Sequence, residues 1–150
     1  MLRLSRKTLF AIEAVLDVAY HAGAQPVQSR EITRRQGIPR RYLEQALQNL
    51  VRGGVLVGVR GPRGGYRLAR ERRRVSVGEI IRAIGDDDSD EPLLEETGSP
   101  LGRKVVRPLW LEMQGELLSR LDGVTMDDLC HRADREGIVS EGRDNLDFSI

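Results

Sequence analysis

The spacing of apolar residues along this chain predicts six helices and two short strands. Apolar residues recur at intervals of three and four, the period of one face of a helix, in six stretches. These stretches cover about residues 5–22, 29–36, 40–52, 77–84, 107–121 and 125–135. The β-branched run at residues 55–59 and the alternating run at residues 66–70 predict strands. We therefore expect a mainly α fold with one small β-hairpin.

Residues that favour helix ends flank several of these stretches. Ser5, Ser29 and Thr125 each stand where a side-chain oxygen can cap a helix N-terminus. Gly23 and Gly37 stand where a glycine can end a helix. We expect these residues to set the boundaries of the first, second and last predicted helices.

The second and third predicted helices are joined by a tight turn at Gly37, which is typical of a helix-turn-helix. An ordinary helical hairpin has the same spacing. The polar face of the third helix favours the helix-turn-helix, because Arg, Gln and Glu match the edges of guanine, adenine and cytosine in the major groove. Each residue taken alone is better explained by simple solvation, so the inference depends on the set. The candidates are Arg40, Arg41, Tyr42, Glu44, Gln45 and Gln48.

Residues 60–67, between the two predicted strands, read Arg-Gly-Pro-Arg-Gly-Gly-Tyr-Arg. Glycine permits positive φ and proline fixes one turn dihedral, so this segment suits the tip of a hairpin. A helix-turn-helix followed by such a hairpin is the order of a winged helix, and arginines on a wing can reach phosphates or a minor groove. A phosphate-cradling nucleotide loop is the alternative, but no Gly-Lys-Ser/Thr follows. The wing candidates for DNA binding are Arg60, Gly61, Arg63 and Arg67, and Lys7 and Ser29 near helix starts complete the set.

Charge is divided unevenly between the two parts of the chain. Residues 1–84 hold 17 Lys and Arg against 6 Asp and Glu, a net +11, and residues 85–150 hold 7 against 17, a net −10. This division indicates that the N-terminal part meets a polyanion such as nucleic acid. Two solvated faces of opposite sign are the alternative.

The sequence divides the chain into four segments. Residues 1–84 are expected to form the winged helix-turn-helix domain, and residues 85–100, rich in Asp and Glu, an acidic linker. A metal loop there is the alternative, but the spacing of a calcium loop is absent. Residues 101–135 are expected to hold a dimerisation helix and a short last helix, and residues 136–150 a flexible tail.

The predicted helix at residues 107–121 carries more apolar surface than a small winged domain can cover. Such a face suits pairing with a second copy across a two-fold axis. Packing onto the first predicted helix is the alternative. The interface candidates are Leu109, Trp110, Met113, Leu117 and Leu121.

Length and composition exclude several classes of protein. The chain has 150 residues and a single cysteine, Cys130, so no disulfide can form within it. Its apolar runs are too short to cross a bilayer and its first residues do not form a signal peptide, so we expect a cytoplasmic protein. No carboxylate pair, nucleophile-base set or metal-ligand spacing stands out, so we expect neither an enzyme nor a metal site.

Several motifs resemble the Rrf2 family of bacterial winged-helix regulators, which includes IscR, NsrR and CymR. They are Tyr-Leu-Glu-Gln at residues 42–45, Arg-Gly-Pro-Arg-Gly-Gly-Tyr-Arg at residues 60–67, Val-Gly-Glu-Ile-Ile at residues 77–81 and Leu-Trp at residues 109–110. The resemblance covers about residues 1–130. It implies a homodimeric transcription factor with recognition helices in the major groove and wings in adjacent minor grooves. Position by position, it implies base reading by Tyr42, Glu44 and Gln45, and insertion of Arg60 into the minor groove.

One departure from the family pattern bears on the cofactor. Cluster-binding members carry three cysteines in the segment that corresponds to residues 85–107, often with a histidine before the Leu-Trp pair, where this chain has Arg107 and no cysteine. Cys130, His21 and His131 cannot supply the usual thiolate set, so we expect no iron-sulfur cluster and no other cofactor. Cys130 is either a redox-sensitive thiol or a packed small side chain, and the second is the commoner fate of a helix cysteine.

These inferences combine into one expected function and one alternative. We expect a homodimeric, sequence-specific repressor that binds an inverted-repeat operator in double-stranded DNA and controls genes of sulfur, cysteine or iron-sulfur metabolism. As in cluster-free members of the family, an effector protein or a small metabolite would supply the signal. The alternative is a protein-interaction module of winged-helix fold, acting through a partner such as a cysteine-biosynthesis enzyme, with DNA binding secondary.

Overall fold

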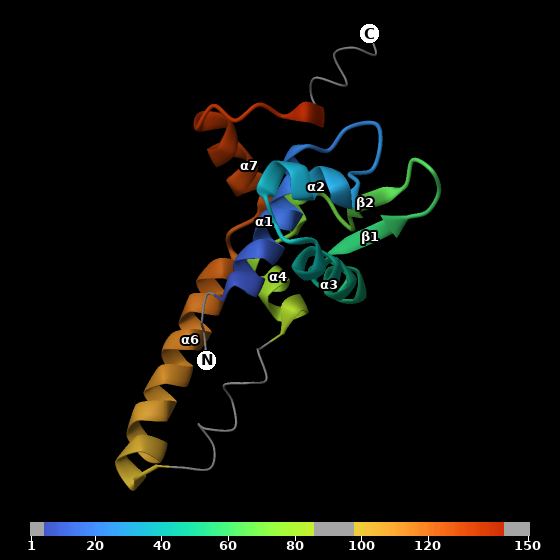
Figure 1. Cartoon of the computed structure of the whole chain (residues 1–150). Coiled ribbons are helices and arrows are strands. Elements are labelled where there is room, and N and C mark those ends of the chain that lie inside the picture. Colours follow the sequence, from blue (N-terminus) through green and yellow to red (C-terminus); the bar gives the residue numbers. More distant parts are fainter. Residues whose placement is uncertain (1–4, 86–97, 143–150) are drawn as a thin grey trace.

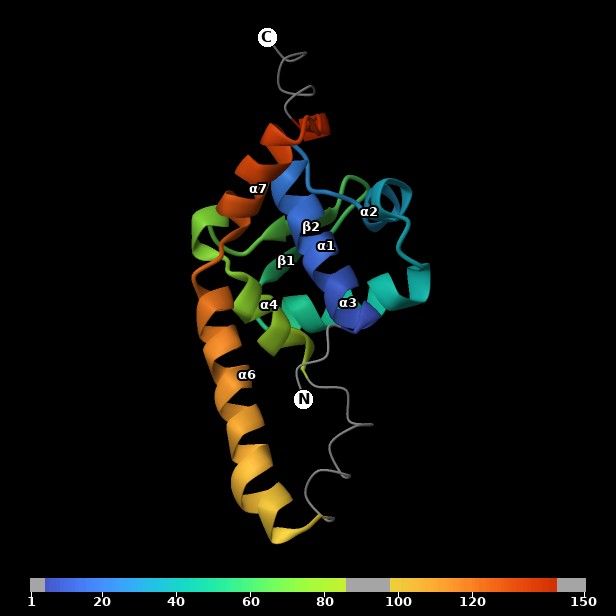
Figure 2. The same cartoon turned by 90° about the vertical axis from the view of Figure 1, so that its left-hand side faces the viewer.

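The computed structural model describes residues 5–85 and 98–142 (Figures 1 and 2). The predicted acidic linker falls largely on residues 86–97, outside the described part. The elements in chain order are α1 (Arg6–Tyr20), α2 (Ser29–Gln36), α3 (Arg40–Arg52), β1 (Leu56–Val59), β2 (Gly65–Leu68), the 3-10 turn η1 (Arg72–Arg74), α4 (Val77–Ile84), the π-helical turn η2 (Gly102–Val106), α6 (Arg107–Asp122) and α7 (Met126–Arg135). The helices α2, α3, α4 and α7 and the hairpin pack around one central helix, α1.

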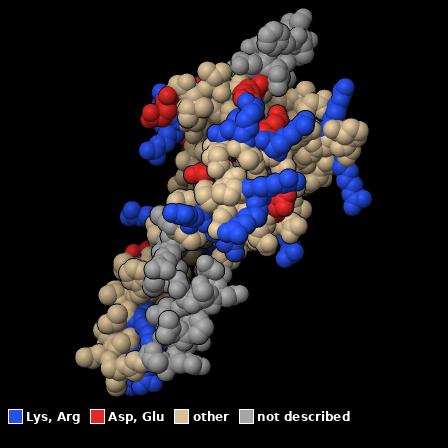
Figure 3. All heavy atoms as spheres, in the orientation of Figure 1, with Lys and Arg blue, Asp and Glu red and all other residues tan. Residues whose placement is uncertain are grey.

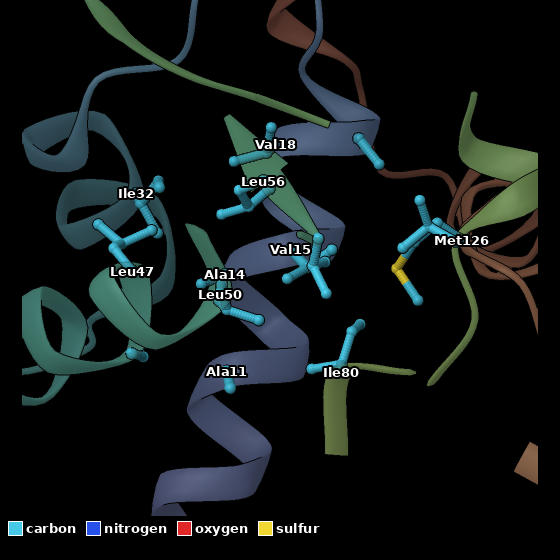
Figure 4. Packing of buried hydrophobic residues seen from close by; sticks show 14 of the residues in the cluster. Ala11, Ala14, Val15, Val18, Ile32, Leu47, Leu50, Leu56, Ile80 and Met126 are labelled. Atoms are coloured by element: carbon cyan, nitrogen blue, oxygen red, sulfur yellow. The ribbon is translucent and has the colours of Figure 1, made fainter. Parts of the chain in front are cut away.

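The core forms on both sides of α1, where small side chains let its neighbours approach closely. Ala11 and Ala14 are fully buried, as are most residues of the α1 stripe that faces the core. Figure 4 shows Leu47 and Leu50 of α3 on one side of α1 and Ile80 of α4 on the other. The helical period predicted a stripe of Leu9, Ile12, Val15, Leu16 and Ala19, of which only Val15 and Ala19 are buried, and Leu9 is 42% exposed. Burial of the apolar side chains on the observed stripe is the main driving force for folding.

The hairpin β1–β2 is antiparallel, with Leu56 opposite Leu68 and Val59 opposite Gly65. An isolated two-stranded hairpin is marginally stable in water. Here Val27 adds one bridge at the outer edge, since its N–H donates to the Tyr66 carbonyl at 3.0 Å and its carbonyl accepts from the Tyr66 N–H at 2.7 Å. The connection between α1 and α2 therefore supports the base of the wing.

The predicted fold class is confirmed: the chain is mainly α with one two-stranded hairpin. The bounds of α3, α4 and α7 match the predicted ranges, and Thr125 caps α7 by accepting from the Asp128 N–H at 3.1 Å. The strands are shorter than predicted at their outer ends. The first helix ends at Tyr20, two residues before the predicted end.

One predicted cap is wrong. Ser29 is the first residue of α2, and the N-cap position belongs to Gln28. The Gln28 N–H donates to the Glu31 carboxylate at 2.8 Å, which compensates for a polar group that the helix start leaves without a partner. The carboxylate three residues into the helix, and not the serine hydroxyl, therefore closes this end.

The helix α6 extends away from the core together with η2 (Figures 1 and 2). Its C-terminal end packs against α4, and the predicted alternative of packing on α1 is at most marginal. Gly78 makes this contact possible, because a Cβ there would lie 1.9 Å from the Asp122 carboxylate. Arg82 of α4 binds the same carboxylate with both terminal nitrogens. Most of α6 is left without a neighbour in the described chain.

After α6 the chain returns to the core. The Val77 N–H donates to the Val124 carbonyl at 2.9 Å, and the Met126 N–H donates to the Val75 carbonyl at 2.8 Å. Met126 and Cys130 of α7 are buried in the same core as α1. Residues 124–135 are therefore packed with residues 5–84, although the sequence grouped them with the dimerisation helix.

Residues 138–142, part of the segment expected to be a flexible tail, lie against the C-terminal end of α1. The Ser140 hydroxyl donates to the Tyr20 carbonyl at 2.7 Å, and the Glu141 N–H donates to His21 Nδ1 at 3.1 Å. Residues 143–150 lie outside the described part. In the ranges that the structure describes, no helix is long and apolar enough to cross a bilayer.

A buried ion pair joins α1 to α2. The Arg35 side chain donates from Nε and from a terminal nitrogen to the two carboxylate oxygens of Asp17, at 2.9 and 2.8 Å. Gln36 donates a third hydrogen bond to the same carboxylate at 2.8 Å. The Asp17 side chain is 0% exposed and that of Arg35 is 9% exposed, so the pair is shielded from water. This cluster fixes the first helix of the helix-turn-helix on α1.

We predict that Asp17→Ala lowers the free energy of unfolding by about 3 kcal/mol, because the Arg35 guanidinium stays buried without its main partner. Urea unfolding at one fixed protein concentration measures this change. The control is Arg40→Ala, which removes the exposed Arg40–Glu44 pair and is expected to cost less than about 1 kcal/mol. Equal losses in the two variants would contradict the role of the buried pair.

Candidate nucleic-acid interface

The helix α3 is held by one face and presents the other to solvent. Leu43, Ala46, Leu47 and Leu50 are buried against α1 and the rest of the core. The intervening polar residues stand outward, as the helical period requires. The exposed positions are Arg40, Arg41, Tyr42, Glu44, Gln45 and Gln48. All six predicted candidates of the third helix therefore share one surface.

Four of these residues pair with one another. Arg40 Nε lies 3.0 Å from the Glu44 carboxylate, one helical turn away. The Arg41 guanidinium stands 4.9 Å from the centre of the Tyr42 ring, and one of its nitrogens donates to the Tyr42 hydroxyl at 3.1 Å. The Tyr42 ring also contacts Phe10 of α1, with ring centres 5.9 Å apart. Tyr42 is thus oriented before any ligand binds.

Gln45 and Gln48 differ from these four. Neither amide has a hydrogen-bond partner in the described part of the chain. An amide carries both a donor and an acceptor and can bind an adenine edge with two hydrogen bonds. These two side chains are therefore the ones whose hydrogen-bonding capacity on α3 is unused.

The shape of the wing depends on glycine at three positions. Gly61 has φ of 114°, and its carbonyl accepts from the Gly64 N–H at 2.9 Å, which closes the turn. A Cβ at Gly64 would lie 2.2 Å from the Val59 carbonyl oxygen, and one at Gly65 would lie 2.4 Å from the Val27 carbonyl oxygen. Larger residues would distort the turn. The glycines thus give the tip its form and leave its arginines exposed.

The three wing arginines have different roles in the structure. Arg60 and Arg63 are exposed at the tip, without a partner among the residues that the structure describes. Arg67 is half-buried and donates to the Ala24 carbonyl at 2.8 Å and the Gly23 carbonyl at 3.4 Å. It braces the wing against the connection between α1 and α2. The sequence grouped it with the DNA-binding candidates because nothing local reveals this internal contact.

Two further candidates lie at helix starts. Lys7 is half-buried in the first turn of α1, and Ser29 is exposed at the first position of α2. Sequence reasoning missed Arg30, the next residue, which is exposed and, together with Arg63, lines a hollow of about 520 Å³ between the start of α2 and the wing. The sequence could have identified Arg30 as a candidate, because a basic residue directly after a predicted helix start is suited to binding a phosphate.

The surface charge follows this arrangement. In Figure 3 Lys and Arg side chains gather over the winged-helix part, including the wing tip at the right, while the part of the projecting helix that the view shows is mostly tan with a few Lys and Arg groups. Some acidic groups of this part are paired with arginines, as in the Arg40–Glu44 pair. Exposed arginines are therefore present on α2, α3 and the wing, including Arg30, Arg40 and Arg60.

Beside its charged residues, the helix α6 exposes a row of large apolar side chains. Leu109, Trp110, Met113 and Leu117 are 54, 49, 45 and 41% exposed. Val105 and Val106 of η2 extend this row at 57 and 60%, whereas Leu121 packs partly against the core. Large contiguous apolar patches are unusual on the surface of soluble monomers.

Comparison with known proteins agrees with this geometry. A model of the Rrf2 family, described as "Iron-dependent Transcriptional regulator", matches residues 4–132. The regulator IscR of Vibrio vulnificus (strain YJ016) is 33% identical over 151 residues, covering 99% of this chain and 88% of that protein. IscR of Aliivibrio salmonicida (strain LFI1238) is 34% identical over 150 residues, with the same coverage.

Solved structures of similar proteins share the fold. The structure of T. potens IscR matches with a TM-score of 0.72 and 32% identity, covering 93% of each chain. The structure of B. subtilis CymR, described as the global cysteine regulator, matches with a TM-score of 0.68 and 27% identity, covering 88% of this chain and 98% of that one.

The residues of this chain do not fit a thiolate-ligated iron-sulfur cluster. Such clusters take several Cys ligands, and the chain has one cysteine and two histidines in all. Cys130 is 2% exposed, and burial raises the pKa of its thiol, which opposes the thiolate form that binds metal. Within residues 5–85 and 98–142, no three His, Cys, Asp or Glu side chains are placed to share a metal ion.

The resemblance noted in the sequence is confirmed by the family model, which spans most of the chain, and by relatives of about one-third identity. The family motifs lie on the exposed polar face of α3 and on the glycine-shaped wing. The chain therefore belongs to the Rrf2 family: it is a transcriptional regulator with a winged-helix DNA-binding fold, and not an enzyme.

Proposed function

We propose that this chain acts as a homodimer that reads an inverted-repeat operator in double-stranded DNA and represses genes of sulfur, cysteine or iron-sulfur metabolism. One observation carries this proposal most directly. Within residues 5–85 and 98–142, Gln45 and Gln48 on the exposed face of α3 have no hydrogen-bond partner, and neither do Arg60 and Arg63 at the tip of the wing. Both elements therefore hold unused hydrogen-bonding groups of the kind that DNA recognition requires.

In the proposed complex, α3 enters the major groove. The groove is about 12 Å wide and admits an α-helix, and a recognition helix contacts bases from its N-terminal residues. Tyr42 and Gln45 lie in the first two turns of α3, and Gln48 follows one turn later. Tyr42 is fixed against Phe10 and Arg41, so little side-chain entropy is lost when it contacts a base.

Glu44 can contact a base only after its hydrogen bond to Arg40 is broken. Its carboxylate is hydrogen-bonded to Arg40, so accepting a cytosine amino group means releasing that arginine. Arg40 is 87% exposed at the side chain and can then turn to a phosphate. The pair therefore keeps two opposite charges satisfied in the free protein and separates them on DNA.

The wing and the helix starts supply the contacts to the backbone and the minor groove. Arg60 is the proposed minor-groove residue, and Gly61 lets the wing backbone approach the DNA strand closely. Arg63, Lys7, Ser29 and Arg30 are proposed to contact phosphates. Arg67 acts indirectly, because its hydrogen bonds to the Gly23 and Ala24 carbonyls fix the direction of the wing.

The dimer is proposed to form through the apolar row on α6 and η2. Two copies related by a two-fold axis would bury the same row against itself, and operator symmetry would follow from that axis. Met113 and Leu117 occupy successive turns of α6 and are both exposed, so the row can continue along the helix. The partly buried Leu121 would lie where the dimer contact meets the core.

The regulated genes and the signal are proposed from the relatives. CymR is described as a global cysteine regulator. A chain without the thiolate set for a cluster is suited to a signal from a partner protein or a small metabolite. Repression follows if the bound dimer occupies a promoter.

A protein-interaction module remains the competing function, because the exposed apolar row on α6 also suits docking to another protein. Salt dependence separates the two. Binding to DNA through six phosphates would weaken about 10³-fold between 50 and 200 mM salt. Docking through an apolar surface would change little over the same range.

We predict that Gln45→Ala and Arg60→Ala each weaken binding to the operator by about 1 to 3 kcal/mol, because each removes a direct contact to a base or groove. Gel-shift titrations with a duplex selected in vitro measure the change. Arg120→Ala is the control, since Arg120 is exposed on α6, away from α3 and the wing. Unchanged affinity in both test variants would remove the basis of the site assignment.

We predict that Trp110→Asp converts the dimer into a monomer, because a carboxylate in an apolar interface loses its hydration without gaining a partner. Sedimentation equilibrium at several protein concentrations measures the mass. Ser119→Asp adds the same charge on another side of α6, as the helical period shows, and is expected to leave the dimer intact. The proposal of an α6 interface fails if both variants keep the wild-type mass.

A further inference from the structure

A short segment near the C-terminus, residues 138–142, crosses the end of α1 beside the first helix of the helix-turn-helix. We refer to residues 138–142 as the strap. The Tyr20 hydroxyl donates to the Ile138 carbonyl, and the Ser140 hydroxyl donates to the Tyr20 carbonyl at 2.7 Å. The second bond satisfies a carbonyl that the end of α1 leaves without a helical partner. The strap is therefore attached to α1 by specific polar contacts.

The strap backbone lies directly on the backbone that follows α1. A Cβ at Gly142 would lie 2.1 Å from the Ala22 carbonyl oxygen and 2.5 Å from that of His21. A Cβ at Gly23 would in turn lie 3.2 Å from the Gly142 Cα. Glycine on both sides permits this close approach, so the backbones of the strap and of residues 21–23 are packed directly against each other.

The strap also binds α2 through an ion pair with Arg35. The Glu141 carboxylate accepts from an Arg35 terminal nitrogen at 2.5 Å and from Arg34 at 2.9 Å. Asp17 of α1 binds the other side of the same Arg35 guanidinium. Burial alone would raise the pKa of Glu141, but the hydrogen bonds from Arg34 and Arg35 outweigh burial and lower it. One side chain of α2 is thus held between two carboxylates from opposite ends of the chain.

His21 makes this attachment sensitive to protons. Its Nδ1 accepts the Glu141 N–H at 3.1 Å, which only an unprotonated nitrogen can do. The charged groups that act on it are Asp17 of α1, Arg34 and Arg35 of α2, and Glu141 of the strap. Burial, followed by the charge of Arg35, lowers the pKa of His21, and the two carboxylates offset only part of this shift. Attachment therefore favours neutral His21 and weakens as the pH falls below its ordinary value of 6.5.

We propose that the strap is a proton-sensitive latch that positions α2, and through α2 the recognition helix α3, with Glu141 as a positioning residue. Protonation of His21 removes the acceptor for the strap N–H and places a positive charge beside Arg35. The attached population of the strap then falls, and Arg35 depends more on Asp17. The effect on DNA binding rests on the proposed function, whereas attachment of the strap does not.

Three forms of the full-length chain test the latch: wild type, Glu141→Gln and His21→Asn. Asparagine places an acceptor oxygen near the position of Nδ1 and does not titrate. The first measurement is the hydrogen-exchange protection factor of the Glu141 amide, or of Gln at that position, by NMR at pH 7.5 and 5.5. A single hydrogen bond changes an equilibrium about threefold to tenfold. We expect a wild-type decrease of that order at pH 5.5, little change in His21→Asn, and low protection at both pH values in Glu141→Gln.

The second measurement is affinity for an in vitro selected operator duplex at the same two pH values and constant salt. We expect wild-type affinity to fall about threefold to tenfold on acidification, and His21→Asn to change much less. His131 is present in both proteins, so a difference between their pH responses reports on His21. The latch is overturned if wild type and Glu141→Gln are equally protected, or if wild type and His21→Asn respond equally to pH.

The two measurements distinguish the possible failures. A strap that detaches without any change in DNA affinity would contradict its role in positioning α2. Absence of sequence-specific DNA binding by all three proteins would contradict the proposed function, while the protection factors would still decide whether the strap responds to protons.

Discussion

The arrangement of the helix-turn-helix depends on one buried ion pair, between Asp17 of α1 and Arg35 of α2. The helix α2 has eight residues and buries few apolar side chains, chiefly Ile32, so apolar packing alone fixes it weakly on the core. Two hydrogen bonds from Arg35 and one from Gln36 to the same carboxylate specify both its position and its rotation. Since the short turn after α2 leads directly into α3, the orientation of the recognition surface follows from this pair.

A second set of contacts connects the proposed dimer helix to the recognition helix. On one side of α4, Gly78 lets α6 approach so closely that Asp122 and Arg82 can bind each other. On the other side, a Cβ at Gly53 would lie 2.7 Å from the Ala83 Cβ, so the end of α3 is packed tightly on α4. Close packing of this kind transmits small displacements. In the proposed dimer, the spacing of the two α3 helices is therefore set through α4.

Much of this fold was predictable from local sequence patterns, because its helices carry clear apolar stripes and its wing is specified by glycines. The bounds of α3 and α4 followed from periodicity and from stop signals within a few residues. Contacts between distant segments leave no such pattern. The hydrogen bond from Arg67 to the Ala24 carbonyl and the ion pair between Arg35 and Glu141 join residues far apart in the chain. The sequence alone does not show which partner an arginine or a glutamate binds. For the same reason, the packing of α7 into the core could not be predicted from the sequence.

The central claim is that α3 reads bases, and the most direct test is a cycle that combines protein and DNA substitutions. In a selected operator, the base pair read by Gln45 is replaced by each alternative, in one half-site and then in both, and affinities are measured for wild type and Gln45→Ala. We predict that replacement costs wild type about 1 to 3 kcal/mol per half-site and costs Gln45→Ala almost nothing. If every base-pair replacement costs wild type and Gln45→Ala the same, α3 does not read the operator through Gln45.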